Sequence, residues 1–328
     1  MKQITTKIIS LTSLLVLTTI LIIISGCTSN SQQHAVSQTD GKMKIAVTFF
    51  PLYDLTKDIA GEKADVYSII PNGIEPHDFE PTIDAIKKLN SADAFVTIGI
   101  EFQQTEQKLI DAVNPNIKLI SSSKGLELIN LKSETGSVPE LGNQGNQSNT
   151  INSEGKTGKD THIWLSPKNM ILMAENIAEG LKSINLNNAE YYDSGLNKTL
   201  SKLVQLDKEY KEGLSNCSKD TILVSHNAFA YLARDYGFNF ISISGLSPEL
   251  EPSPQQIKQL VDIAKEKNLK YIFYESLVDP RVSQTIAKET GAQTLELDPI
   301  EGSNDPNADY FSIMRKNLEN LKIALECK

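Results

Sequence analysis

Residues 71–81 have the sequence Pro-Asn-Gly-Ile-Glu-Pro-His-Asp-Phe-Glu-Pro, a proline-rich acidic stretch with a histidine near its centre. The apolar run at 66–70 before it predicts a buried strand, and the spacing of apolar residues at 82–89 after it predicts a helix. Three prolines fix the backbone φ and disfavour helix in the residues before them, so the stretch is expected to be a stiff loop. His77 is therefore predicted on a preorganised strand-to-helix loop, which suits a ligand.

Two more of the four histidines occupy similar places. His162 lies in Asp-Thr-His-Ile-Trp-Leu-Ser-Pro and His226 in Leu-Val-Ser-His-Asn-Ala-Phe, each where an apolar run meets the start of a predicted helix. The fourth, His34, lies in a polar segment and is expected to be solvated. Three histidines are thus predicted at the rim of one cleft.

Strands and helices alternate along most of the chain, which predicts an α/β fold with right-handed parallel sheets covered on both faces. Ligands of such folds bind outside the carboxyl ends of the strands. The predicted strands are 45–50, 66–70, 94–98, 117–120, 221–224, 238–243, 271–274 and 294–297. The predicted helices are 52–60, 82–89, 103–112, 167–182, 227–236, 254–267, 281–290 and 309–325.

One long amphipathic helix is predicted at 188–214. At about 1.5 Å per residue it would span on the order of 40 Å, enough to run the length of the molecule and join two lobes. We therefore expect an N-terminal lobe at 43–186, a linking helix at 187–215 and a C-terminal lobe at 216–328. The stretch 133–159 is polar and is expected to be a surface loop of the first lobe.

The first 26 residues have a basic start, an apolar run at 8–24 and small residues before Cys27. This pattern resembles a lipoprotein signal peptide cleaved ahead of Cys27, with a plain transmembrane anchor as the alternative. Residues 27–42 are expected to be a flexible tether. Either way the folded part is predicted outside the cytoplasm and attached to the membrane. The net charge of −9 argues against nucleic acid as a partner.

The chemistry of the strand-end residues favours a metal. In the second lobe His226, Glu275 and Asp298 each follow a predicted strand, and zinc is satisfied by four imidazole or carboxylate ligands in a tetrahedron. The spacing alone is not diagnostic, because no His-Glu-x-x-His or Cys-x-x-Cys motif is present. Each residue also has a structural alternative; Asp298 before Pro299, for example, is compatible with a simple turn.

Together, the lipobox, Gly-Ile-Glu-Pro-His-Asp-Phe-Glu-Pro, Asp-Thr-His-Ile-Trp-Leu-Ser-Pro, Val-Ser-His-Asn-Ala-Phe and Phe-Tyr-Glu-Ser resemble the cluster A-I metal-binding lipoproteins. These are the zinc and manganese solute-binding proteins of ABC transporters, and the resemblance runs from about residue 44 to the C-terminus. It implies two (β/α) lobes bridged by one long rigid helix, with a metal between them. It also implies an ABC-transporter permease as partner and a lipid anchor at Cys27 on the outer face of the cell membrane. We expect the protein to be a monomer.

By motif position the resemblance implies four metal ligands, with Glu275 and Glu301 as supporting or substitute residues. Manganese members typically have Glu where this chain has His226, so Zn²⁺ is the expected ligand and Mn²⁺ the alternative. Many zinc members carry a His-rich loop, whereas the loop 133–159 here has no histidine. The four implied ligands are His77, His162, His226 and Asp298.

Two other classes of function remain open from the sequence. A zinc hydrolase would keep three histidine ligands and a water, with Glu275 as general base. An adhesin or purely structural surface protein would leave the strand-end histidines unexplained. We expect a binding protein and no enzyme.

Two cysteines, Cys217 and Cys327, remain besides Cys27. An even pair in an exported domain favours a disulfide, here closing a loop of about 110 residues. Free thiols are the alternative, since sequence does not show whether the two Cα atoms are close enough to bridge.

Overall fold

The computed structural model describes residues 42–99, 104–130, 159–245, 248 and 252–328, and Lys42–Lys328 form one compact unit. The expected signal peptide 1–26, the acylated Cys27, nearly all of the tether and nearly all of the polar loop 133–159 lie outside the described residues. Within the part that is described, no helix combines the length and apolar character needed to cross a membrane. The expected lobe boundaries remain a prediction.

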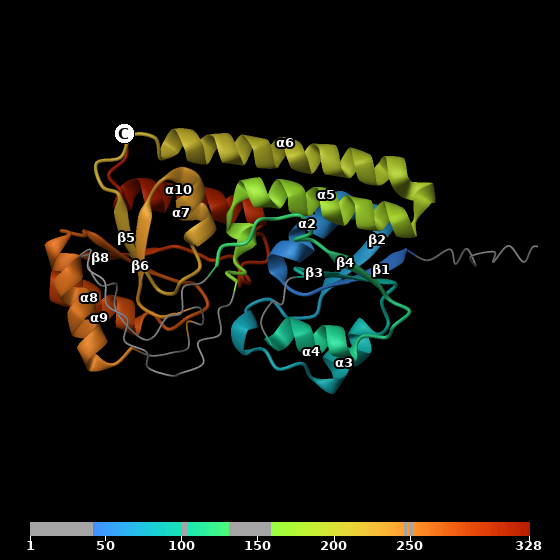
Figure 1. The fold of residues 1–328 in the computed structure, drawn as a ribbon, viewed down its shortest axis with the longest axis horizontal. Helices are drawn as coiled ribbons and strands as arrows, with labels where there is room; N and C mark the ends of the chain where they lie inside the picture. The colour runs from blue at the N-terminus through green and yellow to red at the C-terminus, as the bar shows by residue number, and fades with distance from the viewer. Residues whose placement is uncertain (1–41, 100–103, 131–158, 246–247, 249–251) are drawn as a thin grey trace, which may run out of the picture. The chain divides into compact units, whose positions relative to one another are not determined.

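The N-terminal half is built on a parallel four-stranded sheet with the order β2-β1-β3-β4 (Figure 1). Its strands are β1 (Met43–Val47), β2 (Ala64–Ser68), β3 (Ala94–Thr97) and β4 (Lys118–Ser121). Its helices are α2 (Phe50–Ala60), α3 (Ile83–Leu89), α4 (Gln104–Ala112) and α5 (Pro167–Ile184). The predicted alternation of strands and helices is confirmed.

Side chains alternate along each strand and so point to both faces of this sheet, and helices cover both faces. Ala46 of β1 packs with Leu89 of α3 and Leu109 of α4 in one buried cluster. Ile45 and Val47 point to the other face, into the main core with α2 and α5. A parallel sheet that is buried on both sides leaves only the ends of its strands for ligands.

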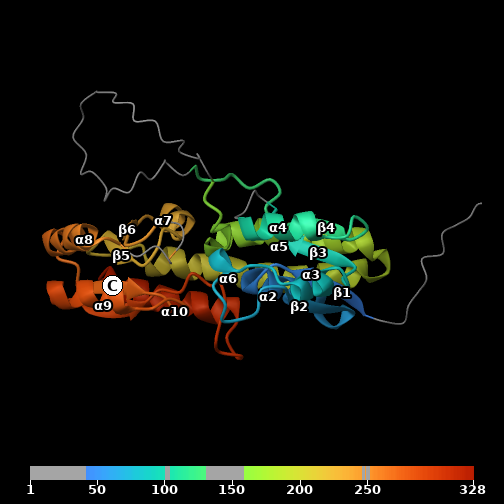
Figure 2. The same cartoon turned by 90° about the horizontal axis from the view of Figure 1, so that it is seen from below.

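The predicted long helix is present as α6 (Ala189–Gly213), a helix of 25 residues that follows a short 3-10 turn, Leu186–Asn188. It packs along α5 and α2 and reaches the C-terminal half (Figures 1 and 2). The helices approach so closely that a Cβ at Gly195 would lie 2.3 Å from the carbonyl oxygen of Ile59, so only glycine fits there. This helix therefore braces both halves.

The C-terminal half contains two parallel strand pairs, β5–β6 and β7–β8, with β5 beside β7. The predicted helix at 227–236 begins later, at Ala230, because the backbone N–H of Asn227 donates to the carbonyl of Gly245 instead (2.8 Å). This leaves His226 on a loop. The elements are β5 (Thr221–Val224), α7 (Ala230–Tyr236), β6 (Asn239–Ser242), α8 (Pro254–Glu266), β7 (Tyr271–Tyr274), α9 (Arg281–Thr290), β8 (Gln293–Glu296) and α10 (Tyr310–Ala324).

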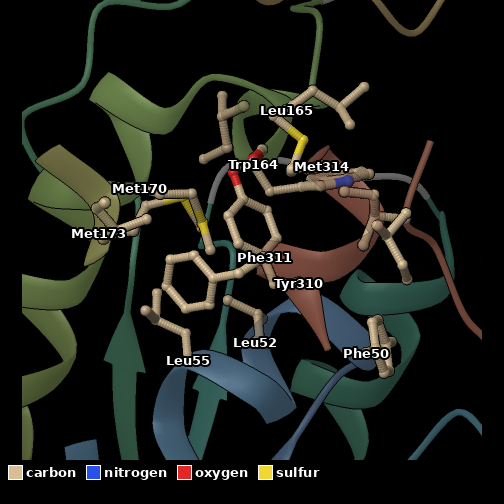
Figure 3. Close-up of a cluster of buried hydrophobic side chains, with 14 of the residues drawn as sticks. Phe50, Leu52, Leu55, Trp164, Leu165, Met170, Met173, Tyr310, Phe311 and Met314 are labelled. Atoms are coloured by element: carbon tan, nitrogen blue, oxygen red, sulfur yellow. Dashed lines mark hydrogen bonds between the residues drawn. The ribbon is translucent and has the colours of Figure 1, made fainter. Parts of the chain in front are cut away.

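The two halves share buried side chains from α2, α5 and α10 (Figure 3). The hydroxyl of Tyr310, at the start of α10, donates to the carbonyl of Trp164 (2.9 Å), and its backbone N–H donates to Asp54 of α2 (2.6 Å). Phe49 packs edge-on against Trp164, with ring centroids 4.8 Å apart. This shared core fixes the strand ends of the two halves relative to one another.

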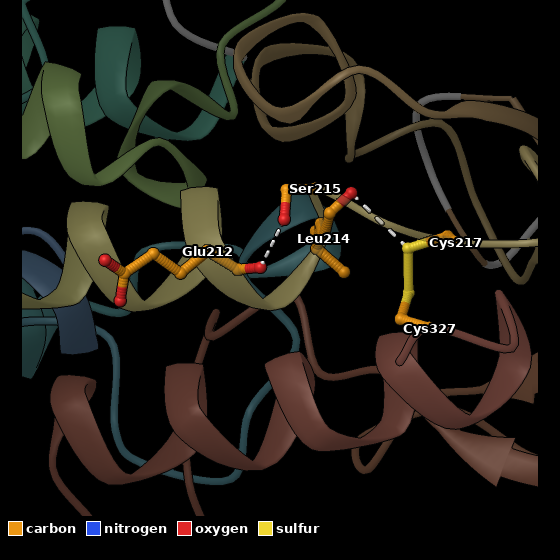
Figure 4. Close-up of a disulfide and its surroundings, with 5 residues drawn as sticks. All are labelled: Glu212, Leu214, Ser215, Cys217 and Cys327. Atoms are coloured by element: carbon orange, nitrogen blue, oxygen red, sulfur yellow. Dashed lines mark hydrogen bonds between the residues drawn. A yellow bond between two sulfur atoms is a disulfide. The ribbon is translucent and has the colours of Figure 1, made fainter.

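A disulfide joins Cys217, just after α6, to Cys327, just after α10 (Figure 4). This bond confirms the predicted pairing, and it closes a loop between residues that are 110 positions apart in sequence. Backbone hydrogen bonds run alongside it, from Lys328 N–H to Asn216 and from Lys219 N–H to Leu325, each 3.0 Å. The C-terminus is thereby tied to the segment that leads into β5.

Candidate metal centre

Three histidines and one glutamate converge where the two halves meet. Their ligand atoms, one from each of His77, His162, His226 and Glu301, all lie within 4.8 Å of one another. The Nε2 atom of His162 lies 3.3 Å from that of His77 and 3.4 Å from that of His226. Glu301 Oε1 lies 2.8 Å from His77 Nε2, 3.4 Å from His162 Nε2 and 3.7 Å from His226 Nε2.

These separations fit one small cation. A tetrahedral zinc ion with bonds of about 2.0–2.1 Å holds its four ligand atoms about 3.3–3.4 Å apart. Five of the six separations lie between 2.8 and 3.7 Å, around that value, and all six are within 4.8 Å. Small side-chain rotations would therefore seat the ion with all four protein atoms as ligands.

Carboxylates orient two of the imidazoles by contacting Nδ1, the ring nitrogen that faces away from the other ligands. Asp160 Oδ1 lies 2.8 Å from His162 Nδ1, and Glu275 Oε1 lies 2.6 Å from His226 Nδ1. A proton held on Nδ1 by such a carboxylate leaves Nε2 free to bind a metal and makes the imidazole more basic. The contact of Glu275 fits the supporting role expected of it, and Asp160 makes a contact of the same kind.

His77 is presented by a short 3-10 turn, Pro76–Asp78, in the loop between β2 and α3. Glu75 caps this turn, with its Oε1 accepting the backbone N–H of His77 at 2.9 Å. Asp160 accepts the backbone N–H of His162 in the same way, also at 2.9 Å. Both histidines therefore follow an acidic residue by two positions, a shared sequence signal whose meaning appears only with these backbone contacts.

The electrostatics favour a cation at the centre. Burial alone would raise the pKa of Glu301, but the three imidazoles, His77 foremost, hold it well below its usual range. Burial would lower the pKa of His226, but Glu275 and Glu301 raise it well above its usual value. Burial lowers the pKa of His77 and keeps this ring neutral. Burial and the Glu301 carboxylate raise the pKa of Glu75 to about 9.

The structure does not bring Asp298 into the ligand group. Its Oδ2 accepts from the Ser276 hydroxyl at 2.7 Å and its Oδ1 accepts from the backbone N–H of Ile300 at 2.7 Å. Both oxygens are thus occupied in holding the loop after β8, and burial raises the pKa of Asp298 to about 6. The fourth position, assigned to Asp298 by motif, is taken in the structure by Glu301.

Hydrogen bonds and burial fix the conformation of the loop that carries Glu301. Ile300 is fully buried with φ of +60°, a conformation that is uncommon for a β-branched residue and costs on the order of 1–3 kcal/mol. The indole N–H of Trp164 donates to the Pro299 carbonyl at 2.7 Å. The Asn317 side chain bonds both the N–H and the C=O of Asp298. These contacts stabilise the turn that directs Glu301 at the histidines.

The fold and this group of side chains define an α/β protein with parallel sheets, a long bracing helix and a buried site suited to a transition metal. The chain belongs to the family described as ZnuA, zinc-uptake complex component A, periplasmic, which matches residues 45–324.

Several known proteins are similar to it. The high-affinity zinc uptake system protein ZnuA of Bacillus subtilis is 31% identical over 321 residues, which cover 96% of this chain and 98% of that protein. The zinc-binding protein AdcA of Streptococcus pyogenes is 34% identical over 292 residues, which cover 88% of this chain and 57% of that protein. The chain therefore spans a little over half the length of that relative.

Among solved structures, the Zn(II)-bound ZnuA-like domain of Streptococcus pneumoniae AdcA superposes with a TM-score of 0.72 at 32% identity. The match covers 87% of this chain and all of that chain. The resemblance inferred from the motifs is confirmed at the level of family and fold.

Proposed function

We propose that this protein captures Zn²⁺ outside the cytoplasm and delivers it to an ABC-transporter permease for uptake. One observation carries the proposal: three imidazole nitrogens and one carboxylate oxygen, from both halves of the fold, meet within 4.8 Å. His77, His162, His226 and Glu301 are the proposed ligands. The zinc-uptake family and the zinc-binding names of the relatives support this choice.

The donor set favours binding over catalysis. Catalytic zinc sites keep one position open for water, whereas four protein atoms here are placed to fill a tetrahedron. Glu275, the base of the alternative hydrolase, is engaged with His226 Nδ1 and faces away from the metal position. We therefore propose that the protein is not an enzyme and that it releases the bound zinc ion without any chemical reaction.

The anchoring proposal rests on the sequence. A signal of the lipoprotein type ahead of Cys27 would leave an acylated N-terminus and a polar tether of residues 27–42. Such a tether keeps the metal-binding unit close to a membrane permease without fixing its orientation. We propose that the mature protein is a monomer attached in this way to the outer face of the cell membrane.

The metal preference is directly testable. We expect one tight equivalent of zinc and much weaker manganese binding, since manganese prefers oxygen-rich sites and lies low in the divalent affinity order. His226→Glu should shift the preference towards manganese. Equilibrium dialysis against both metals, followed by elemental analysis, measures this; tighter binding of manganese than of zinc by the wild type would contradict the proposal.

Zinc binding should release protons. In the metal-free protein His226 has a raised pKa and carries a proton that the metal must displace from Nε2. Affinity should therefore fall as pH decreases, beginning above the ordinary histidine value of about 6.5. Calorimetry at pH 7.5 in buffers of different ionisation enthalpy should show about one or more protons released. An affinity that does not change between pH 7.5 and 5.5 would contradict this site.

A further inference from the structure

Glu75 is a second carboxylate beside the proposed ligands, and the proposed function assigns it no role. Its Oε1 is fixed by the backbone N–H of His77 and lies 3.9 Å from His77 Nε2, the nitrogen that faces the metal position. Asp160 and Glu275 differ from it, because they contact the opposite nitrogen of their histidines. Glu75 therefore lies on the metal side of the ring.

The second oxygen of Glu75 is buried beside another carboxylate. Oε2 is buried and has no hydrogen-bond donor among the described residues; the neighbouring Glu301 carboxylate repels this group, and His226 attracts it more weakly. An ionised carboxylate that is buried without a donor or a cation is unfavourable. Two carboxylates side by side, each with a buried oxygen that has no partner in the described chain, form a place that a divalent cation would stabilise.

Exposure shows from which side the site is reached. The side chains of Glu75 and His77 are 9% and 5% exposed, whereas Glu301 is 1% exposed and the other two histidines are fully buried. Solvent thus meets the Glu75–His77 edge of the group first. A cation entering from solvent passes this edge before it reaches the interior ligands.

We propose that Glu75 is an entry ligand, whose carboxylate binds the incoming divalent cation together with His77 before the cation settles among all four proposed ligands. The inference rests on the proposed function. Because the carboxylate is held in place by the His77 N–H, it offers the ion a preformed oxygen in exchange for hydration water. A group that stabilises only the path into the site changes entry and exit rates equally and leaves the equilibrium nearly unchanged.

The test is Glu75→Gln in the full chain, with zinc alone as the probe. Glutamine keeps a carbonyl oxygen to accept the His77 N–H but cannot ionise to bind the cation. Association is followed by rapid mixing with zinc and dissociation by capture with excess chelator. We expect both rate constants to fall together by about tenfold, with Kd within about threefold of wild type.

The matched control is Asp78→Asn, which removes an exposed negative charge from the same loop and should change both rates by less than about twofold. Rates of Glu75→Gln that equal those of this control would overturn the inference. So would a weaker Kd at unchanged association rate, or an effect seen in Glu75→Ala but not in Glu75→Gln, which would indicate a loop-positioning role. A wild type that binds no stoichiometric zinc would overturn the proposed function itself.

Discussion

Replacing Glu301 with glutamine is expected to weaken zinc binding at least about 100-fold, or about 2.7 kcal/mol. The carboxylate is the only negative ligand in a buried group with three neutral imidazoles, and its Oε1 contacts the metal-facing nitrogen of each. Without that charge the cation would lose both a ligand and the neutralisation of its charge in a poorly solvated site. Competition with a zinc chelator of known affinity measures the loss.

Asp298→Asn is the matched control, because it also removes one negative charge from the same loop. Asparagine keeps an oxygen for the Ile300 N–H and an amide that can bond Ser276, so the loop should hold its shape. We expect a loss of less than about tenfold. If Asp298→Asn weakened zinc binding more than Glu301→Gln, the motif-based ligand would be correct and the structure-based one wrong.

Replacing Cys217 and Cys327 with serine is expected to lower the free energy of unfolding of the metal-free protein by about 4 kcal/mol. The disulfide spans 110 residues, and the entropy that such a closed loop removes from the unfolded chain grows with its length. For a unit of this size the midpoint of thermal unfolding should fall by roughly 5–8 °C. Calorimetry of metal-free protein measures both quantities.

Reduction of the wild type provides the internal control, since it breaks the same bond without changing a side chain. Reduced wild type and the double variant should unfold at similar temperatures, and both should retain stoichiometric zinc binding, because neither cysteine belongs to the ligand group. Alkylation of both thiols in native, unreduced protein would show that the bond does not form. Equal stability of the variant and the oxidised wild type would show that the bond contributes little.

The sequence by itself determined the order of strands and helices. Helix 281–290 and strand 271–274 were predicted at their observed bounds, because short apolar runs and a terminal glycine are local signals. The long helix was evident from its apolar spacing, observed at Ala189–Gly213. The three histidines of the group were also singled out by the sequence, since each lies where an apolar run precedes a predicted helix, a local signal that needs no partner to be recognised.

Only the tertiary structure shows which carboxylate joins the three histidines. Asp298 and Glu301 lie three residues apart in one loop, and either carboxylate suits a zinc ion. The choice depends on Ser276, Asn317 and Trp164, which come from distant parts of the chain and engage the backbone and carboxylate around Asp298.

The same is true of the residues around the histidines. The positive φ of Ile300 redirects the chain so that the next side chain points at the site, and no sequence pattern for a β-branched residue predicts that conformation. Glu75 is an ordinary acid in the sequence; its place at the solvent edge of the site appears only when the loop of His77 is packed against the loop of Glu301. Local periodicity determines where helices and strands form. The direction in which a loop side chain points depends on contacts between segments that are far apart in sequence.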